Sequence, residues 1–227
     1  SQEHARDDVI AVLDHLKLDQ AHIVGLSQGG FATLHVALSY PQRARSITLA
    51  GTGSGAQPAL RDQFRKEATA MADLIQQNGM EVAAQRYALG AARVQLQNKD
   101  PRGWQEFANQ LAQHSTLGSA LTMRGYQAKR PSLWDLEDQI KRIDVPTLII
   151  TGDEDEPCIE PSVWLKRMIP RAGLCVMPRA GHAINLEEPD AFNQAVLHFL
   201  HAVENNKWGP RDPRAAPGSL LGIQHKN

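Results

Sequence analysis

The stretch AHIVGLSQGGFATLHVAL, residues 21–38, changes its hydrophobic period at a serine that stands among glycines. Before this serine, Ile23, Val24 and Leu26 form the short apolar run that a strand buried on both faces requires. After it, apolar residues recur at the spacing of a helix. Ser27 therefore lies at the corner where a buried strand turns into a helix.

The corner carries a Gly-x-Ser-x-Gly string made by Gly25, Ser27 and Gly29, in the strand-to-helix context of a nucleophile elbow. We expect both glycines to lie so close to neighbouring backbone that a side chain would collide, and Ser27 to be strained with its Oγ projecting outward. The helix that starts at Gln28 directs its dipole at the same point, so the Gln28 N–H is the expected donor to an oxyanion. Two other interpretations stay open: a corner used only for tight packing, and a phosphate site at the helix N-terminus.

The rest of the chain alternates strands and helices. Further strands are expected in ARSITLAGT (44–52), VPTLIITG (145–152) and GLCVMP (173–178), and later helices near 162–168 and 189–204. A first amphipathic helix opens the chain. This alternation predicts an α/β fold with a four-stranded parallel sheet and helices on both faces.

Composition divides the chain into four parts. Residues 1–54 are expected to form the first part of the core and residues 131–206 the second. Between them, residues 55–130 lack β-branched runs and are rich in Gln and Ala, which predicts a helical insertion. From residue 207 several prolines interrupt the sequence without periodicity, so 207–227 is expected to be a flexible tail.

Charge and hydropathy limit the expected partners. The 227 residues carry a formal net charge of -1 and no basic tract, which argues against nucleic acid or an anionic membrane as the main partner. No apolar run approaches the roughly 20 residues that span a bilayer. Cys158 and Cys175 fit neither a disulfide framework nor a zinc spacing. We therefore expect free thiols, no metal, no cofactor and a cytoplasmic location.

A serine hydroxyl needs a base to accept its proton before it becomes a good nucleophile. His182, in PRAGHAINLEEP, follows the last expected strand on a loop, which is where a parallel sheet presents reactive groups. His35 and His198 lie in expected helices and His22 begins a strand, so these three are expected to be structural. His182 is the expected base.

A carboxylate that orients the histidine is expected in the acidic run DEDEP, directly after the third strand. Spacing alone leaves Asp153, Glu154, Asp155 and Glu156 open. Whichever member lies over the sheet edge would orient and stabilise the imidazole. The chain then carries serine, carboxylate and histidine in that order.

This order, together with the corner and the helical insertion, resembles the α/β-hydrolase superfamily over nearly the whole chain except the tail. GLSQGG is similar to the family's nucleophile elbow and implies Ser27. TGDEDEP is similar to its acid loop, whose aspartate usually stands three residues after the glycine, which implies Asp155. AGHAINLEEP resembles its histidine loop and implies His182. Residues 55–130 stand where many members carry a lid over the active site.

The resemblance also implies a reaction. A serine nucleophile in this family suits the hydrolysis of small carboxylic esters through an acyl-enzyme intermediate. The alternatives are hydrolysis of enol-lactones or of carbon-carbon bonds and, in a different class, a non-catalytic binding module. The expected partner is a small-molecule ester or lactone, with Trp104, Phe107, Met123 and Tyr126 as candidate pocket residues.

In one respect the chain departs from the family. Members place four further strands before the helix that opens this chain, and a loop after one of them supplies a second oxyanion N–H. We therefore expect an N-terminally truncated form of the fold with weak activity on its own. The strand at 23–26 is then expected at an edge of the sheet, with Ser27 open on one side.

Overall fold

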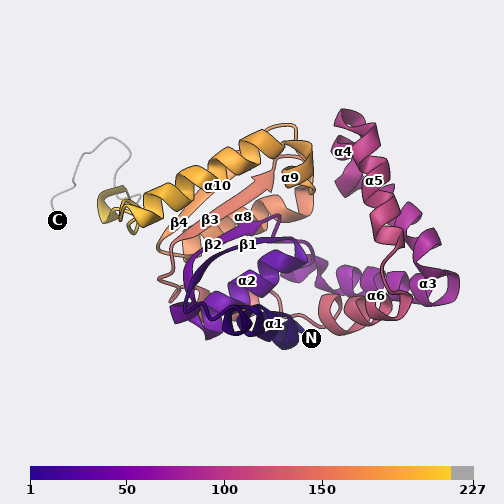
Figure 1. The fold of residues 1–227 in the computed structure, drawn as a ribbon, viewed down its shortest axis with the longest axis horizontal. Helices are drawn as coiled ribbons and strands as arrows, with labels where there is room; N and C mark the ends of the chain where they lie inside the picture. The colour runs from indigo at the N-terminus through magenta and orange to yellow at the C-terminus, as the bar shows by residue number, and fades with distance from the viewer. Residues whose placement is uncertain (216–227) are drawn as a thin grey trace.

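The structure is a computed structural model that describes residues 1–215. One parallel sheet forms its centre, with the strand order β1-β2-β3-β4 (Figure 1). The strands are β1 (Ala21–Leu26), β2 (Ala44–Ala50), β3 (Thr147–Gly152) and β4 (Ala172–Met177). Within the described residues β1 pairs only with β2, so the expected edge position is confirmed. The predicted α/β fold is likewise confirmed.

Helices cover both faces of this sheet. Figure 1 shows α10 on one side of the strands and α1 and α2 on the other. The alternating side chains of β3 explain the two layers, because Ile149 packs into the cluster with α2 and α8, whereas Leu148 and Ile150 pack into the cluster with α10. The helices of this layer structure are α1 (Gln2–His15), α2 (Gln28–Ser39), α7 (Glu137–Ile140), α8 (Glu156–Met168), α9 (Ile184–Glu187) and α10 (Pro189–Glu204).

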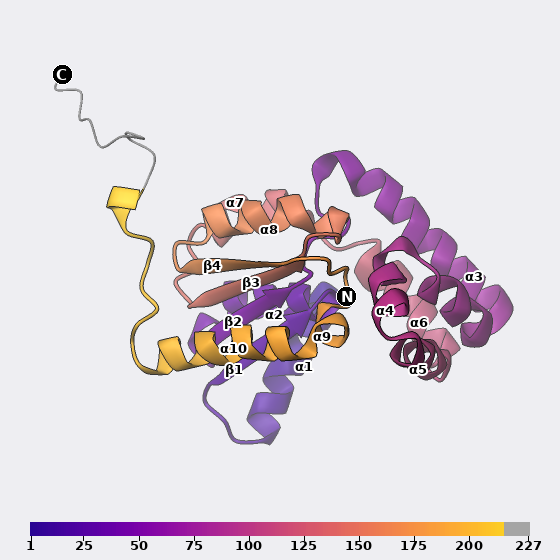
Figure 2. The ribbon, with the colours of Figure 1, turned by 90° about the horizontal axis from the view of Figure 1, so that it is seen from above.

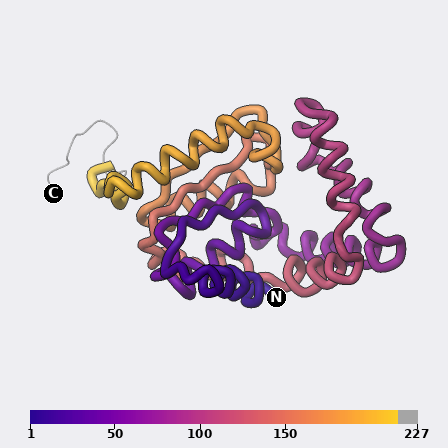
Figure 3. Tube along the Cα trace, in the orientation of Figure 1, coloured from indigo at the N-terminus to yellow at the C-terminus, as the bar shows by residue number. Residues whose placement is uncertain are grey.

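A second group of helices lies beyond one end of the sheet (Figures 1 and 2). The chain leaves the sheet after β2, runs through these helices and returns to β3 (Figure 3). Their own apolar cluster contains Ile75, Met80, Ala83 and Ala120. They are α3 (Arg61–Ala88), which bends at Gly79, α4 (Val94–Lys99), α5 (Pro101–Ala112) and α6 (Thr116–Thr122). All four fall inside the stretch 55–130.

Helix α8 begins earlier than the sequence predicts. It starts at Glu156, not near Ser162, because Pro157 stands in the first turn, where its missing N–H costs no hydrogen bond. Within the acidic run, Glu156 is therefore the first residue of α8, and Asp155 occupies its N-cap position.

The beginning of the expected tail is attached to the core. Trp208 packs edge-on against Phe199 with ring centroids 4.7 Å apart, and its indole N–H donates to the carbonyl oxygen of Arg171 at 2.8 Å. The prediction of a flexible tail is therefore wrong at its first residues, and residues 216–227 lie outside the described part. No helix within residues 1–215 is both long and apolar enough to cross a bilayer.

The burial of His35 on α2 predicts a loss of stability in acid. Burial lowers the pKa of His35 from 6.5 to about 4, against the opposing effect of the Glu3 carboxylate. In the unfolded chain the His35 imidazole is protonated below about pH 6.5, whereas in the folded protein it becomes protonated only near pH 4. Between pH 7 and pH 5 this linkage removes about 2 kcal/mol from the free energy of unfolding. Urea titrations should show a weaker fall for His35→Asn, and equal pH slopes for both proteins would contradict this assignment.

Candidate active site

The corner between β1 and α2 holds Ser27 in an unusual backbone conformation. Its φ of 54° and ψ of -114° lie in a region that costs about 1–3 kcal/mol for a residue with a side chain. The Ser27 N–H donates to the carbonyl oxygen of Ala50 at 2.8 Å, so the pairing of β1 with β2 continues into the corner. The strain expected at Ser27 is therefore present.

The two glycines of the motif do not have equal roles. A Cβ at Gly25 would lie 2.2 Å from the carbonyl oxygen of Gly29, so that position requires glycine as expected. A Cβ at Gly29 would meet nothing within 4 Å, and the expected collision there is wrong. The second tight position is Gly30, where a Cβ would lie 1.9 Å from Thr52 Oγ1, because the first turn of α2 directs this residue toward the end of β2.

Three side chains from separate loops meet beside this corner. His182 Nε2 lies 2.8 Å from Ser27 Oγ, and His182 Nδ1 lies 2.7 Å from Asp155 Oδ2. Asp155 and His182 are 1% and 5% exposed, so bulk water does not compete for the hydrogen bond between them. Asp155 comes from the end of β3 and His182 from the loop after β4, as parallel strands require.

The other acidic side chains of the run face away from the histidine. Asp153 Oδ1 accepts a hydrogen bond from the Ala180 N–H at 3.1 Å, and Glu154 Oε2 accepts one from Gln95 Nε2 at 2.5 Å. Glu156 is exposed in the first turn of α8. Asp155 is therefore the member of the run that the structure brings to His182.

The histidine loop is held by a buried carboxylate that sequence reasoning passed over. Glu187 accepts hydrogen bonds from the N–H groups of Gly181 at 2.5 Å and Ala183 at 3.0 Å. The His182 N–H donates to the carbonyl oxygen of Ala92 at 3.3 Å, which ties this loop to the helical segment. Glu187 follows the histidine by five residues within the stretch AGHAINLEEP, so the signal was present in the sequence.

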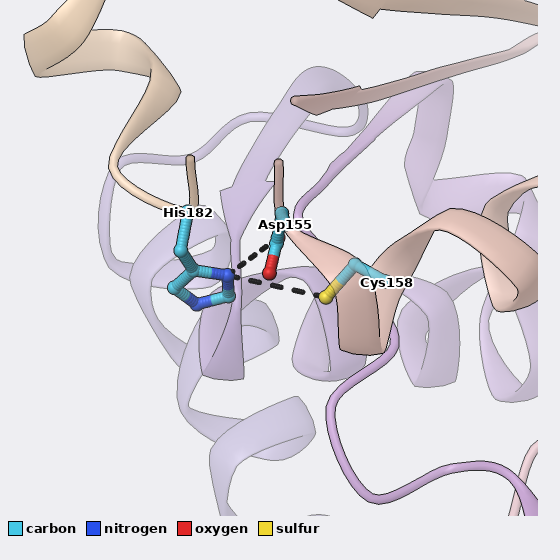
Figure 4. A group of neighbouring side chains, drawn as sticks. All are labelled: Asp155, Cys158 and His182. Atoms are coloured by element: carbon cyan, nitrogen blue, oxygen red, sulfur yellow. Dashed lines mark hydrogen bonds and ion pairs between the residues drawn. The ribbon is translucent and has the colours of Figure 1, made fainter. Parts of the chain in front are cut away.

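A thiol lies against the same pair, as Figure 4 shows. Cys158 Sγ is 3.9 Å from His182 Nδ1 and 3.4 Å from the carbonyl oxygen of Gly51, to which it donates. Burial, together with the charge of Asp155, raises the pKa of this thiol, which keeps it protonated. Asp155, Cys158 and His182 offer atoms within 4.8 Å of one another, as metal ligands do. Two tetrahedral ligands of one zinc ion lie about 3.3 Å apart, however, so the 2.7 Å contact between nitrogen and carboxylate fits a hydrogen bond.

Two cavities meet at Ser27. The larger has a volume of about 770 Å³ between the corner and the helices α3, α5 and α6, and the smaller has about 410 Å³ and is also lined by His182. Phe107 lines the larger cavity and Met123 lines both. A substrate could thus contact the serine from either cavity.

Two of the four expected pocket residues do not line these cavities. The indole N–H of Trp104 donates to the carbonyl oxygen of Ala88 at 2.8 Å, and the buried Tyr126 hydroxyl donates to the carbonyl oxygen of Gln28 at 2.8 Å. Both side chains instead hold backbone together, because their polar atoms find carbonyl partners inside the protein. The cavities are also lined by three arginines that the sequence analysis did not single out: the exposed Arg86 and the buried Arg93 and Arg130.

Comparison with known proteins gives the family of this chain. Residues 1–195 match the alpha/beta hydrolase family. The chain belongs to this family. It is 30% identical over 190 residues to 3-oxoadipate enol-lactonase 2 of Acinetobacter baylyi, covering 83% of this chain and 67% of that protein. This alpha/beta hydrolase is also similar to a hydrolase from Pseudomonas aeruginosa, with 29% identity, a TM-score of 0.75, and 88% and 72% of the two chains covered. The fold of MenH from S. aureus superposes with a TM-score of 0.81 at 22% identity, covering 90% and 77%.

A methyl group at Gly51 is expected to disturb the contact between Asp155 and His182. Gly51 has a φ of +52°, and its added Cβ would lie 3.2 Å from His182 Nδ1 and 3.4 Å from Asp155 Oδ2. Gly51→Ala should lower the kcat of hydrolysis by about 10-fold or more, with little change in KM, because a small displacement of reacting groups is costly. The exposed Gly209 has open space around it and a matched Gly209→Ala variant should retain the original kcat. Equal kcat values for the two variants would show that Gly51 has no such role.

Proposed function

We propose that this alpha/beta hydrolase is a serine hydrolase of small carboxylic esters that works through an acyl-enzyme intermediate. The observation that carries the proposal is the continuous chain of contacts from Ser27 Oγ through His182 to Asp155, at 2.8 Å and 2.7 Å. These are distances at which a proton moves between a nucleophile and its base. The chain of contacts ends at a serine that borders both cavities.

In the acylation step, Ser27 Oγ attacks the ester carbonyl carbon while its proton passes to His182 Nε2. The Asp155 carboxylate accepts a hydrogen bond from His182 Nδ1–H, which selects the tautomer and stabilises the imidazolium that forms. The carbonyl oxygen becomes an oxyanion near the start of α2. The Gln28 N–H, at the first position of that helix, is the proposed donor to it.

The intermediate then collapses and the alcohol leaves with the proton from His182 Nε2. Water enters, gives a proton to the same nitrogen and attacks the acyl group on Ser27. The carboxylic acid departs when the proton returns to Ser27 Oγ. His182 therefore acts as base and acid in turn, which its contact with Ser27 allows without rearrangement.

Enol-lactone hydrolysis is the second candidate. It is favoured by the 30% identity with the enol-lactonase of Acinetobacter baylyi, and it uses the same attack on an ester carbonyl. In a lactone the leaving oxygen stays attached to the acyl group, so the product is a single molecule. A non-catalytic binding module, in contrast, would have no need of a serine strained against its neighbours.

Replacement of the nucleophile tests the proposal. Ser27→Ala should lower kcat for p-nitrophenyl esters by about 10⁴-fold or more, because it removes the attacking oxygen. The unfolding midpoint should change little, since alanine keeps the Cβ and loses only the hydroxyl that contacts His182 Nε2. Wild-type protein should react with a fluorophosphonate probe at Ser27, and Ser27→Ala should not. An unlabelled wild-type protein without esterase or lactonase activity would support the binding module instead.

A matched pair of carboxylates tests the role of Asp155. Asp155→Asn should lower kcat by about 10⁴-fold, because the amide favours the wrong tautomer of His182. Asp153→Asn keeps an oxygen for the Ala180 N–H and should remain close to wild type. Kinetics of both variants with one ester measure the difference. The opposite ranking would remove Asp155 from the proposed site.

A further inference from the structure

Three arginines are buried without an acidic partner. Arg61 and Arg93 are 8% exposed and Arg130 is 3% exposed. Among residues 1–215, no carboxylate lies within 4.0 Å of any of these three guanidinium groups, although other arginines, such as Arg43, have acidic partners. Burying a charged guanidinium without a counterion costs free energy, so other groups must stabilise the charge of these arginines.

Aromatic rings supply part of this stabilisation. The Arg130 guanidinium lies 3.8 Å from the ring centroid of Phe31 and 4.8 Å from that of Phe64. The Arg93 guanidinium lies 4.7 Å from the ring centroid of Tyr87. Such contacts between a cation and the face of an aromatic ring are favourable, and they leave the charge in place. Burial lowers the pKa of Arg130 to about 10, so its guanidinium still carries a full charge at neutral pH.

The donors of Arg93 are only partly used. Of its five N–H donors, one meets the Tyr87 hydroxyl at 2.8 Å and one meets the carbonyl oxygen of Ala92 at 3.3 Å, while Nε is buried without a partner. Arg130 donates to the carbonyl oxygen of Ser54 and to Gln127 Oε1, and its Nε is likewise buried without a partner. Arg93 and Arg130 therefore each keep unused N–H donors, and what distinguishes Arg93 is that it lines both cavities, whereas Arg130 lines only the smaller one.

Both arginines border the proposed site. Arg93 lines both cavities together with Ser27, and Arg130 lines the smaller one together with His182. The larger cavity has no Asp or Glu among its lining residues. The smaller one has a single acidic residue, the exposed Glu67. Arg61 lines neither cavity, so it is no candidate for contact with a substrate.

We propose that the substrate of this site is an ester or lactone that carries a carboxylate, and that Arg93 binds this carboxylate while Arg130 adds positive potential. The proposal rests on the proposed function, because it places the reactive carbonyl at Ser27. A guanidinium is planar and offers parallel N–H groups, which match the two oxygens of a carboxylate. In a cavity of low polarity this contact replaces the counterion that both arginines lack. The apolar walls from Ile75, Met80 and Phe107 then surround the uncharged part of the substrate.

The test compares two esters of equal chain length, p-nitrophenyl hexanoate and mono-p-nitrophenyl adipate. The wild-type protein should have a kcat/KM for the adipate ester about 10- to 100-fold above that for the hexanoate ester, the range expected for hydrogen bonds to a charged group. Arg93→Met should lower kcat/KM for the adipate ester about 10-fold or more beyond any change for the hexanoate ester, mainly through KM, so that the preference disappears. Arg102→Met removes an equal charge from an exposed site on α5 and should keep the preference.

Separate outcomes distinguish the two proposals. Hydrolysis of both esters that depends on Ser27 but shows no preference for adipate would overturn the carboxylate site and leave the proposed function intact. Absence of turnover and of fluorophosphonate labelling would overturn the proposed function. In that case calorimetric titration of adipate decides the site: binding that Arg93→Met abolishes supports it, and no binding to the wild-type protein overturns it.

Folding of the variants is checked by circular dichroism and thermal unfolding. If Arg93→Met does not fold, Arg93→Lys takes its place, since lysine retains the charge but not the planar pair of donors. The adipate preference should then fall without disappearing. An unchanged preference in a folded Arg93→Lys or Arg93→Met would overturn the role of Arg93.

Discussion

The hydrogen bond from the Ser27 N–H to the Ala50 carbonyl oxygen is the contact on which the site depends. It carries the parallel pairing of β1 and β2 one residue past the end of β1, and it holds the strained Ser27 backbone against the end of β2. The tight contacts at Gly25 and Gly30 close the same corner from two sides. The next residue after β2, Gly51, lies directly beneath the contact of Asp155 with His182. The C-terminal end of the first strand pair thus fixes Ser27 and also lies against the contact between the other two side chains.

Much of this arrangement can be predicted from local sequence patterns. The change of hydrophobic period predicts the corner at Ser27, and the loop after the last strand predicts His182. Asp155 is different, because four acidic side chains share the run and only resemblance to a family separates them. The contacts that exclude Asp153 and Glu154 come from Ala180 and Gln95, which are distant in the sequence.

The errors have a common physical origin. Trp104 and Tyr126 have the size and spacing of pocket residues, yet each finds a carbonyl partner that periodicity does not reveal. Trp208 looks like part of a tail, but Gly173 on β4 leaves room for its ring, since a Cβ there would come within 2.6 Å of it. Arg93 and Arg130 are ordinary charged residues in the sequence. Their significance arises only from burial without an acid, which depends on the whole fold.

The meeting of the two cavities at Ser27 has a consequence for how selectivity divides between the parts of a ligand. Ile75 and Met80 contribute only to the larger cavity, and Leu60 and Phe64 only to the smaller one. Groups on either side of a carbonyl at the serine would therefore contact different walls. Substitutions at residues that line only one cavity leave the lining of the other unchanged, so their effects should be nearly additive. During evolution, one cavity could therefore come to accept a larger or smaller group on one side of the carbonyl, while the other cavity continues to recognise the group on the other side.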